Sequence, residues 1–466
     1  MRYILFKTVS GNNYLYSPAR RVVMPISKRL NKELQYGYEG EHTDTYNVLK
    51  EEAYLDDYET DFSGRISRQD VEMSLRRLSQ IVFEMTTACN LRCEYCCYGD
   101  GYITYEKRKS GSLRFETARA VLDYFSGIFD KGMSTGAEAE PFAISFYGGE
   151  PLLKFPVLRD IVEYSKTLPL KGRRRTFTMT TNAMLLRKHA KFLEDNDFSL
   201  LVSLDGNRRH DAYRKTQGGK ESFEIVYENL QYVKRNHPKL FAHIRFNTVY
   251  TDLCDAKEII DFFRSEFGKY PQFSPLRMTG VATGDKERVM SMRKPLVIPM
   301  EEGMLPELIM EDPMHKKVFA LCVRLSENVF HDEGDMLTAQ KGNRYPTGTC
   351  IPFGKRMYVT FEGEFHPCEK VNRDEPWGKV DETGAVVFDI PYIVERFNKV
   401  LDKHAGICSK CYLQQCCTKC ALQFPEFKCC EFVSEEKFRE IMVQTYSYIE
   451  DNPSIVDMLR HNVVIK

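Results

Sequence analysis

Apolar runs alternate with amphipathic stretches through the middle of the chain. Five runs have the length and apolar content of buried strands, at 80–85, 143–147, 175–180, 199–204 and 243–248. Between them lie stretches with the apolar spacing of helices, after Pro156 and at 186–194, 223–235 and 256–266. Repeated strand–helix units of this length predict a parallel sheet covered by helices. Because only five or six units are present, we expect an α/β fold with an incomplete barrel, of the partial (β/α)6 kind.

The first part of the chain has a different pattern. Extended runs at 3–8, 14–17 and 21–24 are short, and the first two are separated by the turn-forming residues Ser10 to Asn13. A polar helical stretch starts near Ser27, another is expected at 46–54, and a short helix at 71–78 precedes the first barrel strand. This pattern predicts a small α+β unit.

Helical segments at 306–310 and 316–328 follow the barrel, and a last helix is expected near 435–448. We therefore divide the chain into four parts. They are a small α+β domain (1–75), the partial barrel (76–280), a helical linker (281–345) and a cysteine-rich domain (346–466).

Charge and hydropathy narrow the classes of function. Lys and Arg together number 66, as do Asp and Glu, so the formal net charge is zero. Nucleic-acid and anionic-membrane binders need a basic surplus, and we expect neither partner here. No apolar run is long enough to span a bilayer, and the first residues lack the pattern of a signal peptide. We therefore expect a cytoplasmic protein.

Fifteen cysteines in a reducing compartment require an explanation other than disulfides. Four lie between residues 89 and 97 and seven between residues 408 and 430, whereas Cys254 and Cys322 stand apart. Clustered thiols of this kind are typical of zinc or iron–sulfur sites.

The first cluster has the spacing CxxxCxxC, formed by Cys89, Cys93 and Cys96. Zinc sites prefer four ligands in paired CxxC units, whereas three thiolates on a cubane leave one iron open to a chelating ligand. The segment resembles the signature of the radical S-adenosylmethionine (SAM) superfamily, in which that iron binds SAM. The resemblance implies that these three cysteines bind a [4Fe–4S] cluster and that Tyr95 packs near the adenine. Cys97 is off the spacing and is expected not to be a ligand.

Further motifs of that superfamily follow in order at the ends of the predicted strands. Residues 146–151 (FYGGEP) resemble its GGEP motif, and residues 180–182 (TTN), 203–206 (SLDG) and 210–214 (HDAYR) resemble later segments. Active sites of such barrels lie at the carboxyl ends of the strands. The resemblance implies that SAM contacts Tyr147, Gly148, Gly149, Glu150, Asn182, Ser203, Asp205 and Arg214.

The second cysteine region resembles the SPASM extension, which holds two auxiliary [4Fe–4S] clusters. The resemblance assigns Cys350, Cys368 and Cys420 to an inner cluster, and Cys408, Cys411, Cys416 and Cys430 to an outer one. Cys417 is an alternative to Cys416, and Cys429 to Cys430, because neither choice fits the family spacing fully. The fourth inner ligand is open, either Cys322 or a substrate on an uncoordinated iron. Paired zinc ribbons are the alternative reading of this region.

These resemblances imply a radical SAM oxidoreductase with three [4Fe–4S] clusters. SPASM-type relatives mostly modify ribosomally made peptides, so we expect a precursor peptide as substrate and a flavodoxin or ferredoxin as electron donor. The expected product is a thioether or carbon–carbon crosslink, and residues 1–75 resemble a leader-peptide recognition domain. Glu369, after Cys368, is a candidate catalytic base, although a surface carboxylate paired with Lys370 is the alternative. Two alternative functions are a sulfatase-maturing, formylglycine-generating enzyme and a non-catalytic zinc protein.

Overall fold

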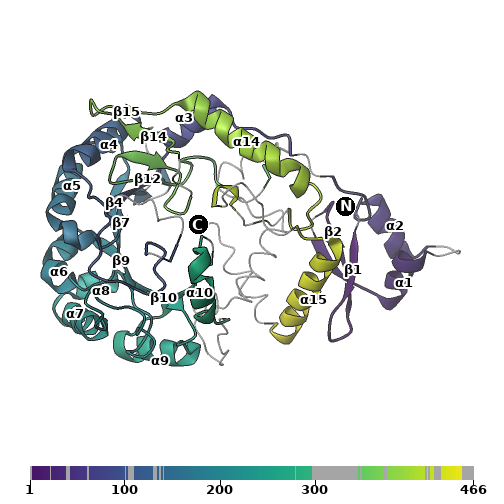
Figure 1. Ribbon diagram of the computed structural model, residues 1–466. Helices are drawn as coiled ribbons and strands as arrows, with labels where there is room; N and C mark the ends of the chain where they lie inside the picture. The colour runs from purple at the N-terminus through teal and green to yellow at the C-terminus, as the bar shows by residue number, and fades with distance from the viewer. Residues whose placement is uncertain are drawn as a thin grey trace. The chain divides into compact units, whose positions relative to one another are not determined.

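The fold is described from a computed structural model (Figure 1). It describes residues 3–295 apart from 21, 38–41, 60–61, 100, 103–109, 130–133, 136–137, 140 and 279. It also describes residues 345–453 apart from 347–348, 372, 374, 415–416, 418–419 and 424–431. The helices expected at 306–310 and 316–328 therefore lie outside the described residues, as do residues 296–344 of the expected linker.

The chain divides into two compact units, each built from separate stretches of sequence. Unit 1 contains residues 1–65, 303–349 and 398–466, and unit 2 contains residues 66–302 and 350–397. Both ends of the chain therefore belong to unit 1. The four-part division expected from the sequence treats these ends as separate domains and remains a prediction.

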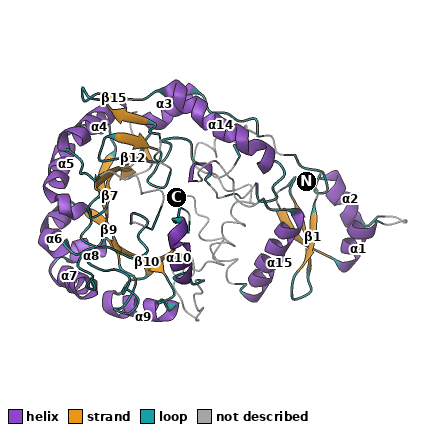
Figure 2. Ribbon diagram, viewed as in Figure 1, coloured by secondary structure: helices purple, strands orange, loops and turns teal. Residues whose placement is uncertain are grey.

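Unit 2 is built on a ten-stranded sheet with helices on its outside (Figure 2). Six parallel strands follow one another across the sheet: β4 (Gln80–Thr86), β7 (Pro141–Gly148), β8 (Arg174–Thr181), β9 (Phe198–Ser203), β10 (Ile244–Tyr250) and β11 (Pro271–Pro275). This arrangement confirms the partial α/β barrel expected from the alternating pattern. A small hairpin of β5 (Ser134–Thr135) and β6 (Glu138–Ala139) lies apart from this sheet.

The helices of unit 2 mostly follow the strands one by one. In chain order they are α3 (Arg68–Arg76), α4 (Phe115–Ile128), α5 (Phe155–Thr167), α6 (Leu186–Asp195), α7 (Phe223–Asn236), α8 (Pro238–Ala242), α9 (Ala256–Phe267) and α10 (Lys286–Ser291). Local signals set their ends. Ser67 and Asp70 form a capping box at the start of α3, and Gly268 ends α9 in the left-handed region with φ 64°.

The two faces of the sheet differ in chemistry. On the outer face, Phe198 of β9 packs against Phe192 of α6, and Phe246 of β10 packs against Phe263 of α9. On the inner face the strands contact one another through polar groups, and Ser145 and Thr178 lie 2.6 Å apart between their hydroxyl oxygens. Alternation along β8, β9 and β10 thus buries one face under helices and leaves the other partly exposed.

Four short strands from the C-terminal part extend the same sheet beyond β4. They are β12 (Met357–Val359), β13 (Glu364–His366), β14 (Gly378–Val380) and β15 (Val386–Val387). β12 pairs in parallel with β4, and the others follow in antiparallel order. The segment that contains Cys368 is thereby built onto the strand that leads to Cys89.

Unit 1 contains a three-stranded antiparallel sheet, whose strands lie at the three extended runs expected near the N-terminus. Its strands are β1 (Ile4–Lys7), β2 (Asn13–Ser17) and β3 (Val22–Ile26), and its helices include α1 (Lys28–Tyr36), α2 (Asp44–Glu51) and α15 (Glu435–Asp451). Leu15 packs with Leu30 and Leu49 in one buried cluster. A second cluster joins Phe6 of β1 to Phe438 of α15.

A long helix, α14 (Ile390–Cys408), runs from the last residues of unit 2 into unit 1 and ends at a predicted iron ligand. Among the helices of the described residues, none combines the length and apolarity needed to cross a lipid bilayer.

Candidate active site

The loop after β4 carries Cys89, Cys93 and Cys96 and is fixed to the segment that follows β9. Arg92 N donates to Lys215 O at 2.6 Å, and Glu94 N donates to Tyr213 O at 3.0 Å. Within the loop, Leu91 N donates to the Cys89 sulfur at 3.4 Å. The loop is therefore held by backbone hydrogen bonds at the carboxyl ends of the strands.

The three thiols lie close enough for their charges to interact, and all are half-buried. Burial raises the pKa of Cys93 to about 11 and also raises the pKa of Cys89 and Cys96. Neighbouring thiolates add to the shift on Cys93 and Cys96. Such thiolates need a bound cation to stabilise them. These three neighbouring thiols are the type and number of donors that an iron–sulfur cluster with three protein ligands requires.

The two glycines of residues 146–151 allow the backbone of residues 86–88 to lie directly against them. Gly148 has φ +123°, and a Cβ on Gly149 would lie 2.0 Å from Ala88 O. Gly149 N donates to Thr86 O at 2.7 Å, and Glu150 N donates to Ala88 O at 2.9 Å. The glycines thus let this segment pack directly against the start of the cysteine loop.

Glu150 is fully buried and organises the end of β8. Its carboxylate accepts hydrogen bonds from Thr181 Oγ1 at 2.8 Å, Asn182 N at 2.8 Å and Leu152 N at 3.0 Å. Burial raises the pKa of Glu150, and these hydrogen bonds oppose the rise. The Asn182 side chain in turn donates to the Cys89 sulfur at 3.5 Å. Glu150 and Asn182 are thus brought to the cluster loop.

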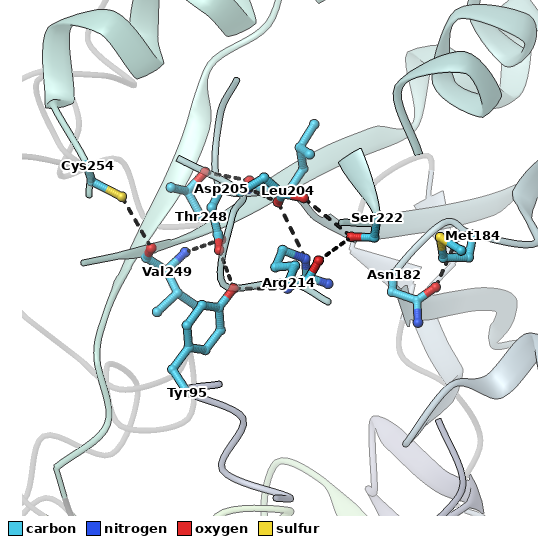
Figure 3. Close-up of polar contacts among 11 residues, drawn as sticks. Tyr95, Asn182, Met184, Leu204, Asp205, Arg214, Ser222, Thr248, Val249 and Cys254 are labelled. Atoms are coloured by element: carbon cyan, nitrogen blue, oxygen red, sulfur yellow. Dashed lines mark hydrogen bonds and ion pairs between the residues drawn. The ribbon is translucent and has the colours of Figure 1, made fainter. Parts of the chain in front are cut away.

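Tyr95, Asp205, Arg214 and Asp211 form a buried polar network, most of which Figure 3 shows. The Tyr95 hydroxyl donates to the Asp205 carboxylate, and Arg214 Nη1 donates to the Tyr95 oxygen at 3.1 Å. Arg214 Nε also lies 3.5 Å from Asp211 Oδ1. Burial raises the pKa of both aspartates, whereas the Arg214 guanidinium opposes that shift.

Two residues predicted to contact SAM, Asp205 and Arg214, have partners within the protein in this network. Asp205 Oδ1 also accepts a hydrogen bond from Val249 N at 2.9 Å, so both of its oxygens have partners within the protein. Asp205 and Arg214 hold Tyr95, and hence the cysteine loop, in position.

Ser203 lies half-buried at the end of β9. Tyr147 contacts Tyr98, with ring centroids 5.8 Å apart.

The C-terminal cysteines are described only in part. Cys408 and Cys411 are buried and joined by a turn in which Cys411 N donates to Cys408 O at 3.0 Å. Cys350 is exposed, and Cys368, Cys417 and Cys420 are half-buried. Cys322, Cys416, Cys429 and Cys430 lie outside the described residues.

One hydrogen bond bears on the predicted inner cluster. Ala421 N donates to Thr349 Oγ1 at 2.8 Å, so the residue after Cys420 contacts the residue before Cys350. Glu369 is paired with Arg356 at 3.3 Å, a different partner from the Lys370 suggested by the sequence.

A buried ion pair beside this site was not predicted from the sequence. Glu84 of β4 is 1% exposed and pairs with Arg373 at 3.1 Å. The sequence does contain one signal for this pair, the carboxylate of Glu84 inside the mostly apolar run 80–85. Because a buried charge requires a partner, this position indicates that a basic residue lies nearby.

Residues 83–262 match the sequence family described as the radical SAM superfamily. This segment is thus similar in sequence to radical SAM domains. The matched segment includes the cysteine loop and the strand-end residues described above. The chain is 26% identical over 208 residues to a cysteine-type anaerobic sulfatase-maturating enzyme of Clostridium novyi (strain NT). It is 21% identical over 253 residues to the radical SAM cyclopropyl synthase TigE of Paramaledivibacter caminithermalis.

These matches cover 43% and 52% of this chain and about half of each relative, 52% and 50%. The fold also matches a solved structure of anSMEcpe with bound AdoMet and the Cp18Cys peptide. The TM-score is 0.51 at 18% identity, over 82% of this chain and 99% of that one. The matched segment is thus similar in sequence to parts of known enzymes, and the likeness of fold extends over most of the chain.

Proposed function

We propose that this protein is a radical SAM peptide maturase that installs a thioether or carbon–carbon crosslink in a ribosomally made precursor peptide. The observation that carries the proposal is the loop of three half-buried cysteines at the strand ends, with Asn182 on Cys89 and Glu150 on Asn182. With a [4Fe–4S] cluster and SAM bound, this site would supply a 5′-deoxyadenosyl radical for hydrogen abstraction. Cys89, Cys93 and Cys96 would hold the cluster, and Glu150 and Asn182 would position the SAM methionine.

The predicted auxiliary clusters are part of this proposal. Cys350, Cys368 and Cys420 would hold the inner one. Cys408 and Cys411 would begin the outer one, because their buried turn has the CxxC geometry of metal-ligating segments. The clusters would take up the electron left after crosslinking, and a flavodoxin or ferredoxin would supply the electron that starts the reaction.

Peptide recognition is proposed for the sheet of unit 1. The β1 side is engaged by α15, because Arg439 Nε donates to Leu5 O at 3.1 Å. Among the described residues, β3 has no strand partner on its outer side. An extended leader peptide would add to β3 as a fourth strand through main-chain hydrogen bonds.

A second candidate function is the conversion of a sulfatase cysteine to formylglycine. It is favoured by the sequence match to the Clostridium novyi enzyme. The two reactions leave different products, since a crosslink loses two hydrogens and keeps sulfur, whereas formylglycine formed from cysteine loses sulfur.

The test is an anaerobic reaction of iron-loaded protein, SAM and reductant. One arm uses peptides encoded by short open reading frames beside the gene, and the other a cysteine peptide of sulfatase type. We expect 5′-deoxyadenosine and the loss of two hydrogens in a neighbouring-gene peptide. Cys96→Ala should abolish both, whereas Cys97→Ala should retain them. Sulfur loss in the sulfatase peptide alone would favour the second candidate, and zinc without sulfide in the purified protein would overturn both.

A further inference from the structure

Residues 280–292, which include the helix labelled α10 in Figure 1, pack against the cysteine loop. Ala282 N donates to Gly101 O at 2.9 Å. Apolar side chains of the two segments form one buried cluster, which includes Tyr95, Tyr102, Val281, Val289 and Met292. Cys93 packs against this cluster. The loop is therefore supported by residues 280–292 as well as by the segment after β9.

Arg288 of α10 contacts the loop between two of the predicted iron ligands. Its Nη1 donates to Glu94 O at 2.8 Å. Its Nε and Nη2 donate to Asp285 Oδ1 at 3.0 Å and 2.8 Å. A Cβ on Gly101 would lie 2.7 Å from Arg288 Nη2, so the glycine leaves room for the guanidinium beside the loop. Asp285 thus fixes the direction in which the planar guanidinium meets the loop.

Glu94, which lies between the second and third predicted ligands, is held from two directions. Its N–H donates to Tyr213 O at 3.0 Å, and its carbonyl accepts the hydrogen bond from Arg288. Its carboxylate pairs with Lys215 at 2.6 Å. Contacts with the protein therefore set the backbone between these ligands. Replacing residues that orient metal ligands commonly lowers metal affinity by about 10- to 100-fold.

The hydrogen bond to Glu94 distinguishes Arg288 from an ordinary surface arginine. Exposed ion pairs contribute little to stability, and Arg288, with 41% of its side chain exposed, forms one with Asp285. The bond to the Glu94 carbonyl instead joins residues 194 positions apart in the sequence. It therefore acts on the conformation of the cysteine loop, whereas the ion pair acts within the segment that contains α10.

We propose that Arg288 is a positioning residue for the SAM cluster. By holding the Glu94 carbonyl, it keeps Cys93 and Cys96 in a cluster-binding conformation before iron is loaded. This role rests on the proposed function, because it concerns the ligands of the SAM cluster. It also gives α10, which the sequence placed in a helical linker, a part in the site.

The first measurement is amide hydrogen exchange of the iron-free protein. In Arg288→Met, exchange in residues 90–99 should rise about tenfold, as expected for one lost hydrogen bond, while β7 and β8 keep wild-type exchange. The matched control is Arg208→Met, because Arg208 also pairs with a carboxylate, Glu221 at 2.7 Å, and lies in the segment after β9. The control should leave the loop unchanged. A rise confined to α10 would show that Arg288 stabilises only its own helix and would overturn the proposal.

The second measurement follows the cluster in iron-loaded, reduced protein challenged anaerobically with an iron chelator. The part of the electron paramagnetic resonance signal that responds to SAM reports on the SAM cluster, and Cys96→Ala should lack it. We expect this signal to decay about tenfold faster in Arg288→Met than in the wild type or Arg208→Met. Equal decay in all three proteins overturns the proposal, whereas the proposed function would still be judged by the crosslinking of a precursor peptide. A wild type without a SAM-responsive signal would overturn both.

Discussion

Tyr95 joins the cysteine loop to the charged side chains of Asp205 and Arg214, and all three residues are buried. Its hydroxyl donates to Asp205 and accepts from Arg214, so one oxygen atom serves both groups. A buried polar group without a partner loses the free energy of hydration that it had in the unfolded chain. The network therefore stabilises the loop only while every member is present.

Removing the Tyr95 hydroxyl tests this dependence. Tyr95→Phe should lower the free energy of unfolding by about 1–3 kcal/mol, because Asp205 and Arg214 each lose a buried partner. The measurement is urea unfolding of the iron-free protein followed by circular dichroism. Tyr213→Phe is the control, since the Tyr213 hydroxyl donates to Asp252 at the exposed surface and should change stability by about 0.5 kcal/mol or less. Equal losses in both variants would contradict a special role for the buried hydroxyl.

Residue spacing pointed to one half of the candidate site and gave no sign of the other. The loop cysteines and the motifs at 146–151 and 180–182 are close in sequence to the strands that position them, so a local pattern identified them. Glu84 and Arg373 are far apart in sequence and meet only because β12 pairs with β4. A register between distant strands leaves no periodicity in the sequence, so this pair could not be predicted.

At the scale of elements, the predictions that succeeded rest on alternation between two faces. The strand expected at 199–204 lies at 198–203, and the helix expected at 186–194 lies at 186–195. Each has one face packed on the neighbouring layer, which the sequence records as an apolar repeat. Strands β12 to β15 have two or three residues each, too few for such a repeat to be visible.

The helix layer contains a histidine, His189, whose protonated form is disfavoured by burial. His189 of α6 is buried and stacked on Phe155 of α5, with ring centroids 3.8 Å apart. Burial lowers its pKa to about 4, with a smaller contribution from Lys188. The unfolded chain, with an ordinary histidine pKa, therefore binds more protons than the folded protein between about pH 6.5 and 4.

Stability should consequently fall as the pH is lowered through that window. We expect the free energy of unfolding to decrease by on the order of 2 kcal/mol between pH 7 and 4 through His189. His189→Phe should remove this part of the decrease, as measured by urea unfolding at a series of pH values. His243→Phe, at an exposed position, should keep the wild-type slope. An identical slope in the wild type and His189→Phe would show that the histidine is not the titrating group.

At the scale of the whole molecule, the two ends of the chain build one core. Phe438 is fully buried, and its ring lies 5.3 Å from Tyr16 of β2 and 6.1 Å from Tyr412. Glu450 accepts hydrogen bonds from Tyr14 at 2.8 Å and Asn12 at 2.9 Å. The proposed peptide-binding sheet and the turn after Cys411 are therefore packed through the same helix, α15.

This arrangement predicts that a change in the last helix loosens the first strands. Phe438→Ala should destabilise unit 1 by about 3–5 kcal/mol, because it leaves a cavity between α15 and the sheet. Amide hydrogen exchange should rise in β1 and β2 and stay unchanged in β7 and β8, whose core belongs to unit 2. Phe432→Ala, at a side chain that is 52% exposed, is the control and should alter neither set. If exchange in β1 and β2 stayed at the wild-type level, the N-terminal sheet would be stable without α15, as a self-contained first domain requires.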